Sequence, residues 1–438
     1  MFFVCGLVPD LKYVRVARRR FDIQCIALIL GAGFVLTAQA RQDIPLTMTE
    51  AEDIAVADEP GRMALLAQAE ALEEQAVAAG QLPDPTLRVG LANFPISDGG
   101  FSTEGMTQAQ LGLRQEFPRS RSRSLNTERL QSMATQVSRN AEARSRDVLT
   151  ATRTGWLESY YWQSAQQIVN ESRPFFADLV NITRSMYAVG RKSQHDVLSA
   201  ELELSRLDDR LIEADRATAE ARAELSRWLG SDANRPVALK LPAWPPLPPL
   251  HDLQQSLDVH PRLGASDADI SARQIGVDLA QESYKTGWTL DLGYGFRDGH
   301  LPSGEPRSDF VSVSVSVGLP FFNENRQDRK LASALKERRA AVASKDEVRA
   351  ELRSRLQAQF ARWNELSSRL ALYEDQILDQ STGRAQAALL AYQSDAGDFS
   401  DVMRAYIDDL NTRLEYIRLQ VERAQSYAVL ANLGGIPR

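Results

Sequence analysis

The chain has 438 residues, a formal net charge of −7, 43% hydrophobic and 25% charged residues, and only two cysteines. The abundance of Ala and Leu with few aromatic residues favours long amphipathic helices over compact globular domains. The acidic balance argues against nucleic-acid binding, which needs clustered positive charge.

The first 40 residues have the organisation of an export signal. Arg15 and Arg18 to Arg20 are positively charged, residues 25–36 are apolar, and Ala38-Gln39-Ala40 fits a small-residue cleavage site. An N-terminal membrane anchor is the alternative, but the apolar segment is short for a span. Both cysteines would be removed with the signal, so we expect no disulfide, and neither lies in a lipid-anchor context. No later segment is apolar enough for a transmembrane helix.

Short motifs recur at an interval of about two hundred residues. Glu59-Pro60 returns as His260-Pro261, and Thr86-Leu87 returns as Thr289-Leu290. This repetition predicts two halves, residues 41–235 and 256–438, joined by a Pro-rich connector at 236–255. In each half the pattern predicts a helix, a strand, a loop, a strand, a very long helix, a tight turn and a returning helix.

In the first half, we expect a helix over residues 49–79, with Thr49 as the N-cap and a break near Pro60. Alternating apolar and polar residues then predict strands at about 86–94 and 107–117. A helical hairpin follows at about 120–230. Its first arm would be roughly 100 Å long at 1.5 Å per residue.

The second half repeats this order. The sequence predicts strands at about 288–297 and 309–319 and a helical hairpin at about 322–434. The alternation is cleanest from Val311 to Val317, where Val and Ser take turns. Such long polar helices are expected to pack side by side as coiled coil. The connector Leu241–Pro249 is expected to lie as an extended strap, and a recognition motif for another protein is the alternative.

The four strands have the length that crosses an outer membrane when tilted. Four strands cannot close a barrel, and lipid does not tolerate open strand edges, so several copies must share one barrel. A soluble two-layer sheet is the competing interpretation. In the barrel, the polar faces would line the lumen with Arg88, Gln110, Arg114, Glu116, Asp291, Ser312, Ser314 and Ser316.

The order of these motifs resembles the TolC-like outer-membrane efflux proteins. The motifs are Leu82-Pro83-Asp84-Pro85 before the first strand, Gln115 to Pro118 after the second, and Tyr187-x-x-Gly190 followed by Asp196 at the first turn. The resemblance implies a fold that is mainly α with a small β part: a coiled-coil α-barrel plus a shared transmembrane β-barrel in a homotrimer. Asn93-Phe94-Pro95 is most similar to the CzcC-like heavy-metal branch. The run Arg119 to Ser122 departs from that branch, as does the lack of His-rich or Met-rich segments.

The resemblance also implies a closing network at the periplasmic end of the tunnel. Tyr392 and Asp401 match the Tyr and the first Asp of the family's network, whereas Gly397 and Arg404 stand at its Arg and second Asp positions. Asp395 and Asp398 lie nearby and could add to a negative ring that favours cations. Ordinary turn and N-cap roles are the alternative for these carboxylates.

The two helical turns are expected to dock the hairpins of a periplasmic adaptor protein. The candidate residues are Val189, Gly190, Arg191 and Lys192 at the first turn, and Gly397, Asp398 and Phe399 at the second. A simple helix–helix turn is compatible with the same residues.

No cofactor or metal site and no catalytic motif is apparent in the sequence. The four histidines show no metal-ligand spacing, and capping or solvated roles are expected for them. The aromatic run at Trp156 and residues 160–162 is expected to pack between helices. No phosphate-binding loop, metalloprotease motif or nucleophile elbow is present, so we expect no enzyme.

The leading hypothesis is a passive outer-membrane exit duct of a tripartite efflux system for small solutes, either metal cations or drugs. Its expected partners are two further copies, a periplasmic adaptor, outer-membrane lipid and, indirectly, an inner-membrane transporter. A type I protein secretion duct shares the same features. A periplasmic coiled-coil adaptor or a purely structural coiled coil would not explain two full repeats with membrane-length strands.

Overall fold

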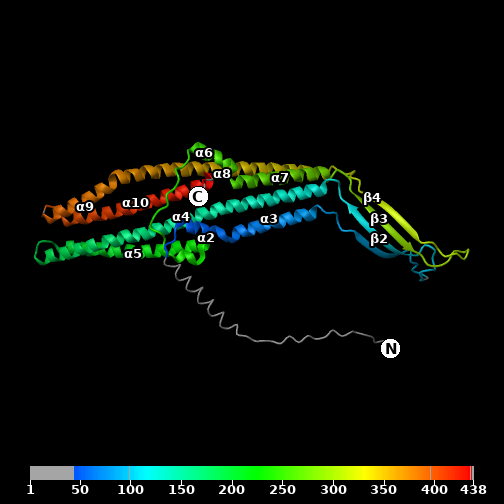
Figure 1. Ribbon diagram of the computed structural model, residues 1–438, viewed down its shortest axis with the longest axis horizontal. Coiled ribbons are helices and arrows are strands. Elements are labelled where there is room, and N and C mark those ends of the chain that lie inside the picture. Colours follow the sequence, from blue (N-terminus) through cyan, green and yellow to red (C-terminus); the bar gives the residue numbers. More distant parts are fainter. Residues whose placement is uncertain (1–43, 98, 395, 435, 437–438) are drawn as a thin grey trace, which may run out of the picture.

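The computed structural model describes residues 44–97, 99–394, 396–434 and 436. The predicted signal peptide lies outside the described residues. The chain forms an elongated body in which long helices run to one end and a four-stranded sheet lies at the other (Figure 1). The expected fold class, mainly α with a small antiparallel β part, is confirmed.

The first half begins with two helices, α2 (Met48–Ala57) and α3 (Pro60–Ala79). They are followed by the strands β1 (Thr86–Ala92) and β2 (Gln108–Phe117). The long helix α4 (Ser122–Ala188) then turns into α5 (Gln194–Leu229), which ends in the short 3-10 helix η1 (Gly230–Asn234).

The second half begins with α6 (Leu250–Ser256), the short 3-10 helix η2 (Leu257–Val259) and α7 (Pro261–Glu282). Strands β3 (Trp288–Phe296) and β4 (Phe310–Val317) follow. The second long helix consists of α8 (Gln327–Leu372), one π-helical turn η3 (Tyr373–Ile377) and α9 (Leu378–Gln393), and α10 (Phe399–Gly434) returns from it.

Two helix starts differ from the sequence-based expectation. The N-cap of α2 is Thr47, whose side chain accepts from the backbone N–H of Glu50 at 3.3 Å, so the predicted cap at Thr49 is wrong. The second long helix begins at Gln327, several residues later than expected, because residues 321–323 have no regular structure and residues 324–326 form a turn before it. Thr47 combines an extended backbone with a hydroxyl oxygen that accepts this hydrogen bond, as N-caps require.

The internal repeat is visible in α3 and α7, which begin at the pairs Glu59-Pro60 and His260-Pro261. Pro60 and Pro261 occupy the first turns of α3 and α7, where their missing N–H costs nothing. The side chains of Glu59 and His260 cap these helices by accepting from the backbone N–H groups of Arg62 and Arg262. His260 therefore has the capping role expected from the sequence.

The helices lie side by side along the body. Near the sheet, α3 packs on α4, α4 on α7, and α7 on α8. Toward the other end, α5 packs on α4, α4 on α10, and α10 on α8 and α9 (Figure 1). α4 and the α8–α9 helix therefore run through the whole body, and shorter helices pack beside them at each end.

The core at mid-length surrounds Trp156, which is fully buried on α4. Its indole N–H donates to the carbonyl of Leu46 at 2.9 Å, and Leu46 pairs in a short parallel bridge with Val237 of the connector. The side-chain amide of Gln163 bonds both backbone groups of Val237. The start of the described chain and the Pro-rich connector are thus held against α4, in agreement with the expected strap.

Buried charges near this core are paired. Arg153 of α4 bonds Glu52 of α2 at 2.6 Å, with both side chains almost fully buried. Arg235 is 2% exposed and forms two hydrogen bonds with the carboxylate of Glu50. Each pair joins α2 to another element, and a buried charge of this kind is costly once its partner is removed.

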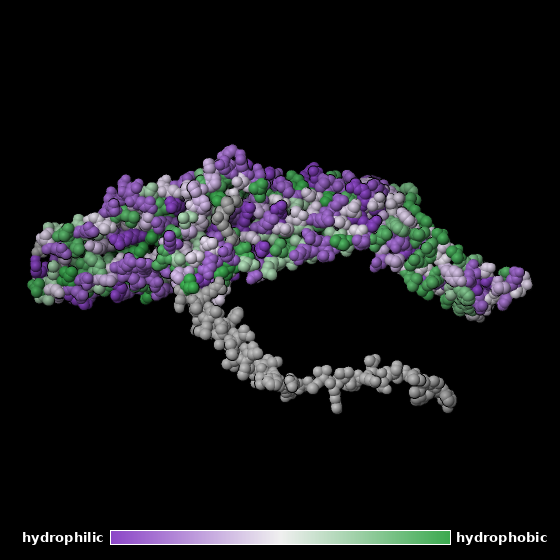
Figure 2. All heavy atoms as spheres, in the orientation of Figure 1, coloured by the Kyte–Doolittle hydropathy of each residue, from purple (hydrophilic) through white to green (hydrophobic). Residues whose placement is uncertain are grey.

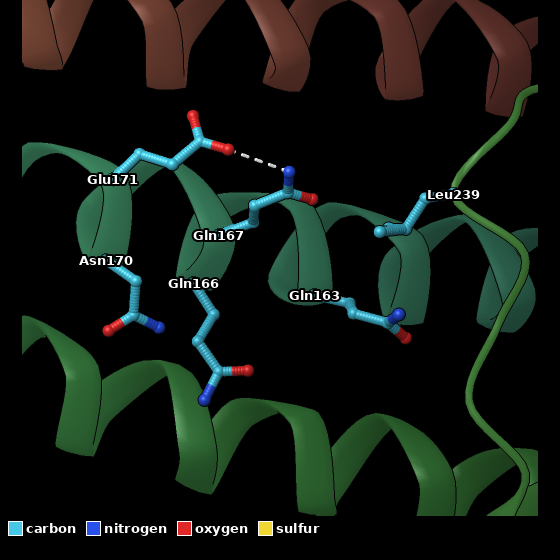
Figure 3. Close-up of a pocket in the computed structure, with 6 residues that line it drawn as sticks. All are labelled: Gln163, Gln166, Gln167, Asn170, Glu171 and Leu239. Carbon is cyan, nitrogen blue, oxygen red and sulfur yellow. Dashed lines mark hydrogen bonds between the residues drawn. The ribbon is translucent and has the colours of Figure 1, made fainter.

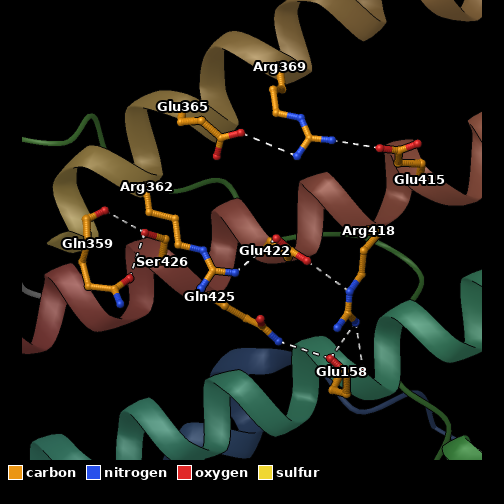
Figure 4. A network of polar contacts seen from close by, with 10 residues as sticks. All are labelled: Glu158, Gln359, Arg362, Glu365, Arg369, Glu415, Arg418, Glu422, Gln425 and Ser426. Atoms are coloured by element: carbon orange, nitrogen blue, oxygen red, sulfur yellow. Dashed lines mark hydrogen bonds and ion pairs between the residues drawn. The ribbon is translucent and has the colours of Figure 1, made fainter.

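A further polar network joins the second half to the first (Figure 4). Arg418 of α10 donates two hydrogen bonds of 2.9 Å to the carboxylate of Glu158 on α4. Glu422 accepts from both Arg418 and Arg362 of α8. Glu158 thus joins α10 to α4, and Glu422 joins α10 to α8.

Candidate functional site

The sheet has the order β1-β2-β3-β4, with every neighbouring pair antiparallel. Its register places all the residues expected to line a lumen on a single face. The rows that cross the sheet include Arg88–Gly112–Gly293–Ser312 and Arg114–Asp291–Ser314, and Glu116 faces Thr289, which faces Ser316. Gln110 lies on the same face, beside Gly295. Strict alternation on four strands therefore produces one continuous polar surface.

An ion pair crosses the middle of this polar face. Nε of Arg114 lies 2.6 Å from a carboxylate oxygen of Asp291 on the neighbouring strand. The face is hollowed into a groove of about 550 Å³, and its polar lining consists of Arg88, Gln108, Gln110, Arg114, Asp291, Ser312, Ser314 and Ser316. Gly112 and Gly293 lie opposite each other on this face, and a Cβ on Gly293 would meet the hydroxyl oxygen of Ser312 at 2.5 Å.

The opposite face of the sheet is apolar and exposed. Val89, Val311 and Val313 are 73%, 80% and 66% exposed, and Leu111, Leu292 and Phe296 accompany them. In Figure 2 the hydrophobic residues gather over the sheet, whereas hydrophilic residues dominate the helical body. An uncovered apolar sheet face of this size is typical of a surface that contacts lipid or protein.

Two arginines that the sequence analysis did not single out tie together the loops at the far end of the sheet. Arg307 donates to the carbonyls of Ser102, Glu104 and Asp298, each at 3.2 Å. Arg297 donates to the carbonyls of Ser308 and Gly105. Both hairpin loops are therefore joined through backbone acceptors. A lone Arg in a loop gives no periodic signal from which this role could have been predicted.

The two turns at the other end of the body contact each other through Tyr392. Its side chain is 1% exposed, and its hydroxyl lies 3.2 Å from the sulfur of Met186 on α4. The ring packs edge-on against Phe399, with centroids 5.7 Å apart, and the ammonium group of Lys192 lies over its face. Tyr392 therefore lies inside this end of the helical body and does not present its ring to solvent.

The predicted docking residues divide into exposed and buried ones. Val189 is 70% exposed, and Gly190 has φ +73°, a left-handed conformation that favours glycine. Arg191 is also exposed, and Lys192 is half-buried against Tyr392. Phe399 is 3% exposed, because its ring packs edge-on against Tyr392, so its side chain lies inside the turn.

The acidic residues predicted at the aperture are at the surface. Asp401 and Arg404 are both exposed and lie 3.9 Å apart on one face of α10. Asp398 is exposed, and its backbone carbonyl accepts from the N–H of Asp401 at 3.1 Å as α10 begins. Gly397 is half-buried beside Ala391. Asp395 lies outside the described residues.

A shallow pocket of about 440 Å³ lies on α4 near the connector (Figure 3). Three glutamines of α4 reach into it, and each is engaged: Gln163 holds Val237, Gln166 donates to Asp215 of α5, and Gln167 donates to Glu171. These amides join α4 to its neighbours, so the pocket is built mainly of structural contacts.

Among the described residues, no group of three or more His, Cys, Asp or Glu side chains is placed to hold a metal ion. The described helices also include none with a stretch long and apolar enough to cross a membrane. Burial, together with Arg146 and Arg262, lowers the pKa of His260 to about 4, which keeps this capping imidazole neutral.

The long helical hairpins, the strap and the two-faced sheet together form a TolC-like fold. Residues 253–435 match the family of outer membrane efflux proteins. The chain is 23% identical over 400 residues to the cobalt-zinc-cadmium resistance protein CzcC of Cupriavidus metallidurans, covering 89% of this chain and 90% of that protein.

Two solved structures have the same fold over nearly the whole described chain. The outer membrane protein VceC of Vibrio cholerae superimposes with a TM-score of 0.74 at 17% identity, covering 89% of this chain and 96% of VceC. The open state of the MtrE outer membrane channel of Neisseria gonorrhoeae gives 0.72 at 16% identity, covering 89% and 88%. The resemblance to TolC-like outer-membrane efflux proteins is thus confirmed.

Proposed function

We propose that the protein is the outer-membrane exit duct of a tripartite efflux system. One observation carries the proposal: the four-stranded sheet has a polar face, an exposed apolar face and two edges, β1 and β4, that pair with no further strand among the described residues. Open edges are not tolerated in lipid, and four strands cannot close a barrel. Three copies joined edge to edge would give a 12-stranded barrel with the polar face inside.

The helices would continue this barrel as a tunnel through the periplasm. α4 has 67 residues, which corresponds to roughly 100 Å of helix. In this arrangement the sheet lies in the outer membrane and the turns at Val189 and Gly397 lie deep in the periplasm. The exposed residues of the first turn, Val189 to Arg191, are then the best candidates to meet a periplasmic adaptor, through which an inner-membrane transporter would supply the energy.

At the periplasmic end we assign Asp398 and Asp401 to a ring of negative charge around the three-fold axis. Each is exposed, and three copies would bring six carboxylates together. Carboxylates grouped around a pore favour cations over anions. In this arrangement Tyr392 supports the ring by holding the end of α9 and does not line the opening.

The likeness to a cobalt-zinc-cadmium resistance protein favours divalent metal cations as the cargo. Cells that lack the gene should then tolerate lower concentrations of cobalt, zinc and cadmium than wild-type cells. Their tolerance of antibiotics is the matched comparison. Equal sensitivity to metals and drugs would indicate a general efflux duct. Loss of a secreted protein from the medium, with unchanged metal and drug tolerance, would instead support the secretion alternative.

The assembly itself is tested by extracting the protein from purified outer membranes and measuring its mass by light scattering in detergent. A species of three chains supports the shared barrel. A monomer in the soluble periplasmic fraction would exclude it and would favour the adaptor alternative.

A further inference from the structure

The protomer has two edge helices that complement each other in charge. Near the sheet the helices lie in the order α3, α4, α7 and α8, so α3 and α8 each have one neighbour in this row. α3 leads directly into the edge strand β1, and the edge strand β4 leads into α8. Any arrangement that joins β4 to β1 of another copy therefore brings α8 close to that copy's α3.

The free side of α3 is acidic. Glu70, Glu73 and Glu74 are exposed, and the helix has no Lys or Arg after Arg62. None of these three carboxylates takes part in an ion pair of the described protomer. Met63 and Val77 on the same helix are 54% and 63% exposed, so apolar surface flanks the acidic residues. We name this surface the acidic edge.

The first third of α8 is basic on its exposed surface. Lys336, Arg338 and Arg339 are exposed and, like the carboxylates of the acidic edge, form no ion pair within the described residues. Leu335 and Val342 beside them are 47% and 40% exposed. We name this surface the basic edge.

Contacts inside the protomer show that the two edges lie at the same height. Thr127 of α4 donates to the carbonyl of Ala76 on α3 at 3.0 Å, which places these two residues level. Near the start of α4, the backbone N–H of Arg121 donates to Glu282 at the end of α7. Since α4 and α7 run in opposite directions, Thr127 is level with a residue near Gly276.

The last step leads from α7 to α8. Arg273, one turn from Gly276, lies 3.3 Å from Glu337 of α8. Ala76 is therefore level with α8 residues close to Glu337, within about one helical turn. The acidic edge at Glu73 and Glu74 consequently lies at the height of Arg338 and Arg339.

The internal repeat provides a template for the junction. α7 is the counterpart of α3, and α8 is the counterpart of α4. The contact between α7 and α4 inside the chain is therefore equivalent, by the repeat, to a contact between α3 of one copy and α8 of another. In the internal junction, the aliphatic part of the basic side chain of Arg139 already lies along α7 beside Gly264.

We propose that the acidic edge of one copy packs against the basic edge of the next, and that these charges set the register in which copies join. The proposal rests on the trimeric duct proposed above. The contact joins different surfaces of the two copies, so every copy is satisfied only when the copies form a closed ring. Exposed ion pairs are individually weak and are screened by salt, and like charges at the same place would disfavour a shifted register.

Engineered cysteines test the contact directly, because the two natural cysteines lie in the predicted signal peptide. The double variant E74C/R338C, treated with a short bismaleimide in outer membranes, should give two- and three-chain bands on a denaturing gel. The control E128C/R338C uses an exposed residue of α4 at the same height but not at an edge, and it should remain mostly one chain. E74C and R338C expressed singly should also remain one chain.

Charge reversal gives an independent readout. The triple variant E70K/E73K/E74K should lower the yield of the three-chain species at least several-fold at low salt. Combining it with K336E/R338E/R339E should restore that yield. A three-chain species by mass with no E74C/R338C cross-linking would overturn this inference and leave the duct intact, whereas a monomeric wild-type protein would overturn both.

Discussion

The ammonium nitrogen of Lys192 lies 4.6 Å from the ring centroid of Tyr392 and joins the turn of the first helical hairpin to the end of α9. The hydroxyl of the same tyrosine reaches Met186 on α4. One aromatic side chain thus connects both hairpins at the end where the proposed tunnel must close. A cation over an aromatic face contributes about 0.5–2 kcal/mol, depending on its exposure.

Replacing Lys192 with Met should loosen this connection, because the side chain keeps its bulk and loses its charge. We expect a higher open fraction of single channels in planar bilayers and higher sensitivity of cells to large antibiotics. Tyr392→Phe is the matched variant, since it keeps the ring under Lys192 and loses only the hydroxyl contact. It should change the open fraction less than Lys192→Met, and the reverse order would exclude the cation–ring contact as the main connection.

The buried pair Arg153–Glu52 should be sensitive to the loss of either partner. Glu52→Gln leaves the guanidinium of Arg153 buried beside a neutral group, so we expect destabilisation of about 3–5 kcal/mol. Thermal unfolding in detergent, followed by circular dichroism, measures the effect. The double variant E52L/R153M removes both charges and should recover most of the loss. If it is as unstable as Glu52→Gln, packing and not charge explains the effect.

The ion pair between Arg114 and Asp291 should influence ion selectivity if the polar sheet face lines a lumen. Asp291→Asn removes one negative charge per protomer and should shift the reversal potential in a KCl gradient toward anion preference. Arg114→Gln should shift it in the opposite direction. Ser312→Ala, on the same face, changes no charge and serves as the control. Identical potentials in all four proteins would place this face outside the conducting path.

His260 should make the protein less stable in acid. Its pKa of about 4 in the folded chain lies below the ordinary value of 6.5, so the unfolded chain takes up a proton first as the pH falls. The stabilisation is complete above pH 6.5 and is lost between pH 6.5 and 4, with a magnitude of roughly 3 kcal/mol.

The variant His260→Asn provides the comparison, because Asn is a good N-cap that does not titrate in this range. Its melting temperature should decline less between pH 6.5 and 4 than that of the wild type. Parallel curves for the two proteins would show that other groups cause the acid sensitivity.

Features with a strong local period were predictable from the sequence. The alternation of Val and Ser from Val311 to Val317 predicts β4. The same alternation of apolar and polar residues in the other strands predicts that Arg114 and Asp291 lie on the polar face of the sheet. The length of α4 follows from the scarcity of Gly and Pro between Ser122 and Ala188. Each of these signals is contained within one segment of chain.

Features that depend on distant segments were not predictable. Phe399 looks available at a turn, but it is buried because Tyr392 and the first hairpin cover it. The anchoring of loop carbonyls by Arg307 depends on two hairpins about two hundred residues apart. The π-helical turn at Tyr373–Ile377 has no Gly or Pro to indicate it.

That π-helical turn has a counterpart in the first half. α4 contains Pro174, which removes one backbone hydrogen bond, and the position equivalent to Pro174 by the repeat is Asp379, two residues past the π-helical turn. Both long helices are therefore interrupted at about the same distance from their turns, with roughly 20 Å of regular helix beyond the interruption. Each such segment is a lever arm: a bend of about 10° at its base moves the turn by roughly 3–4 Å. Six such levers around a three-fold axis would alter the bore at the tip while the sheet end stays still.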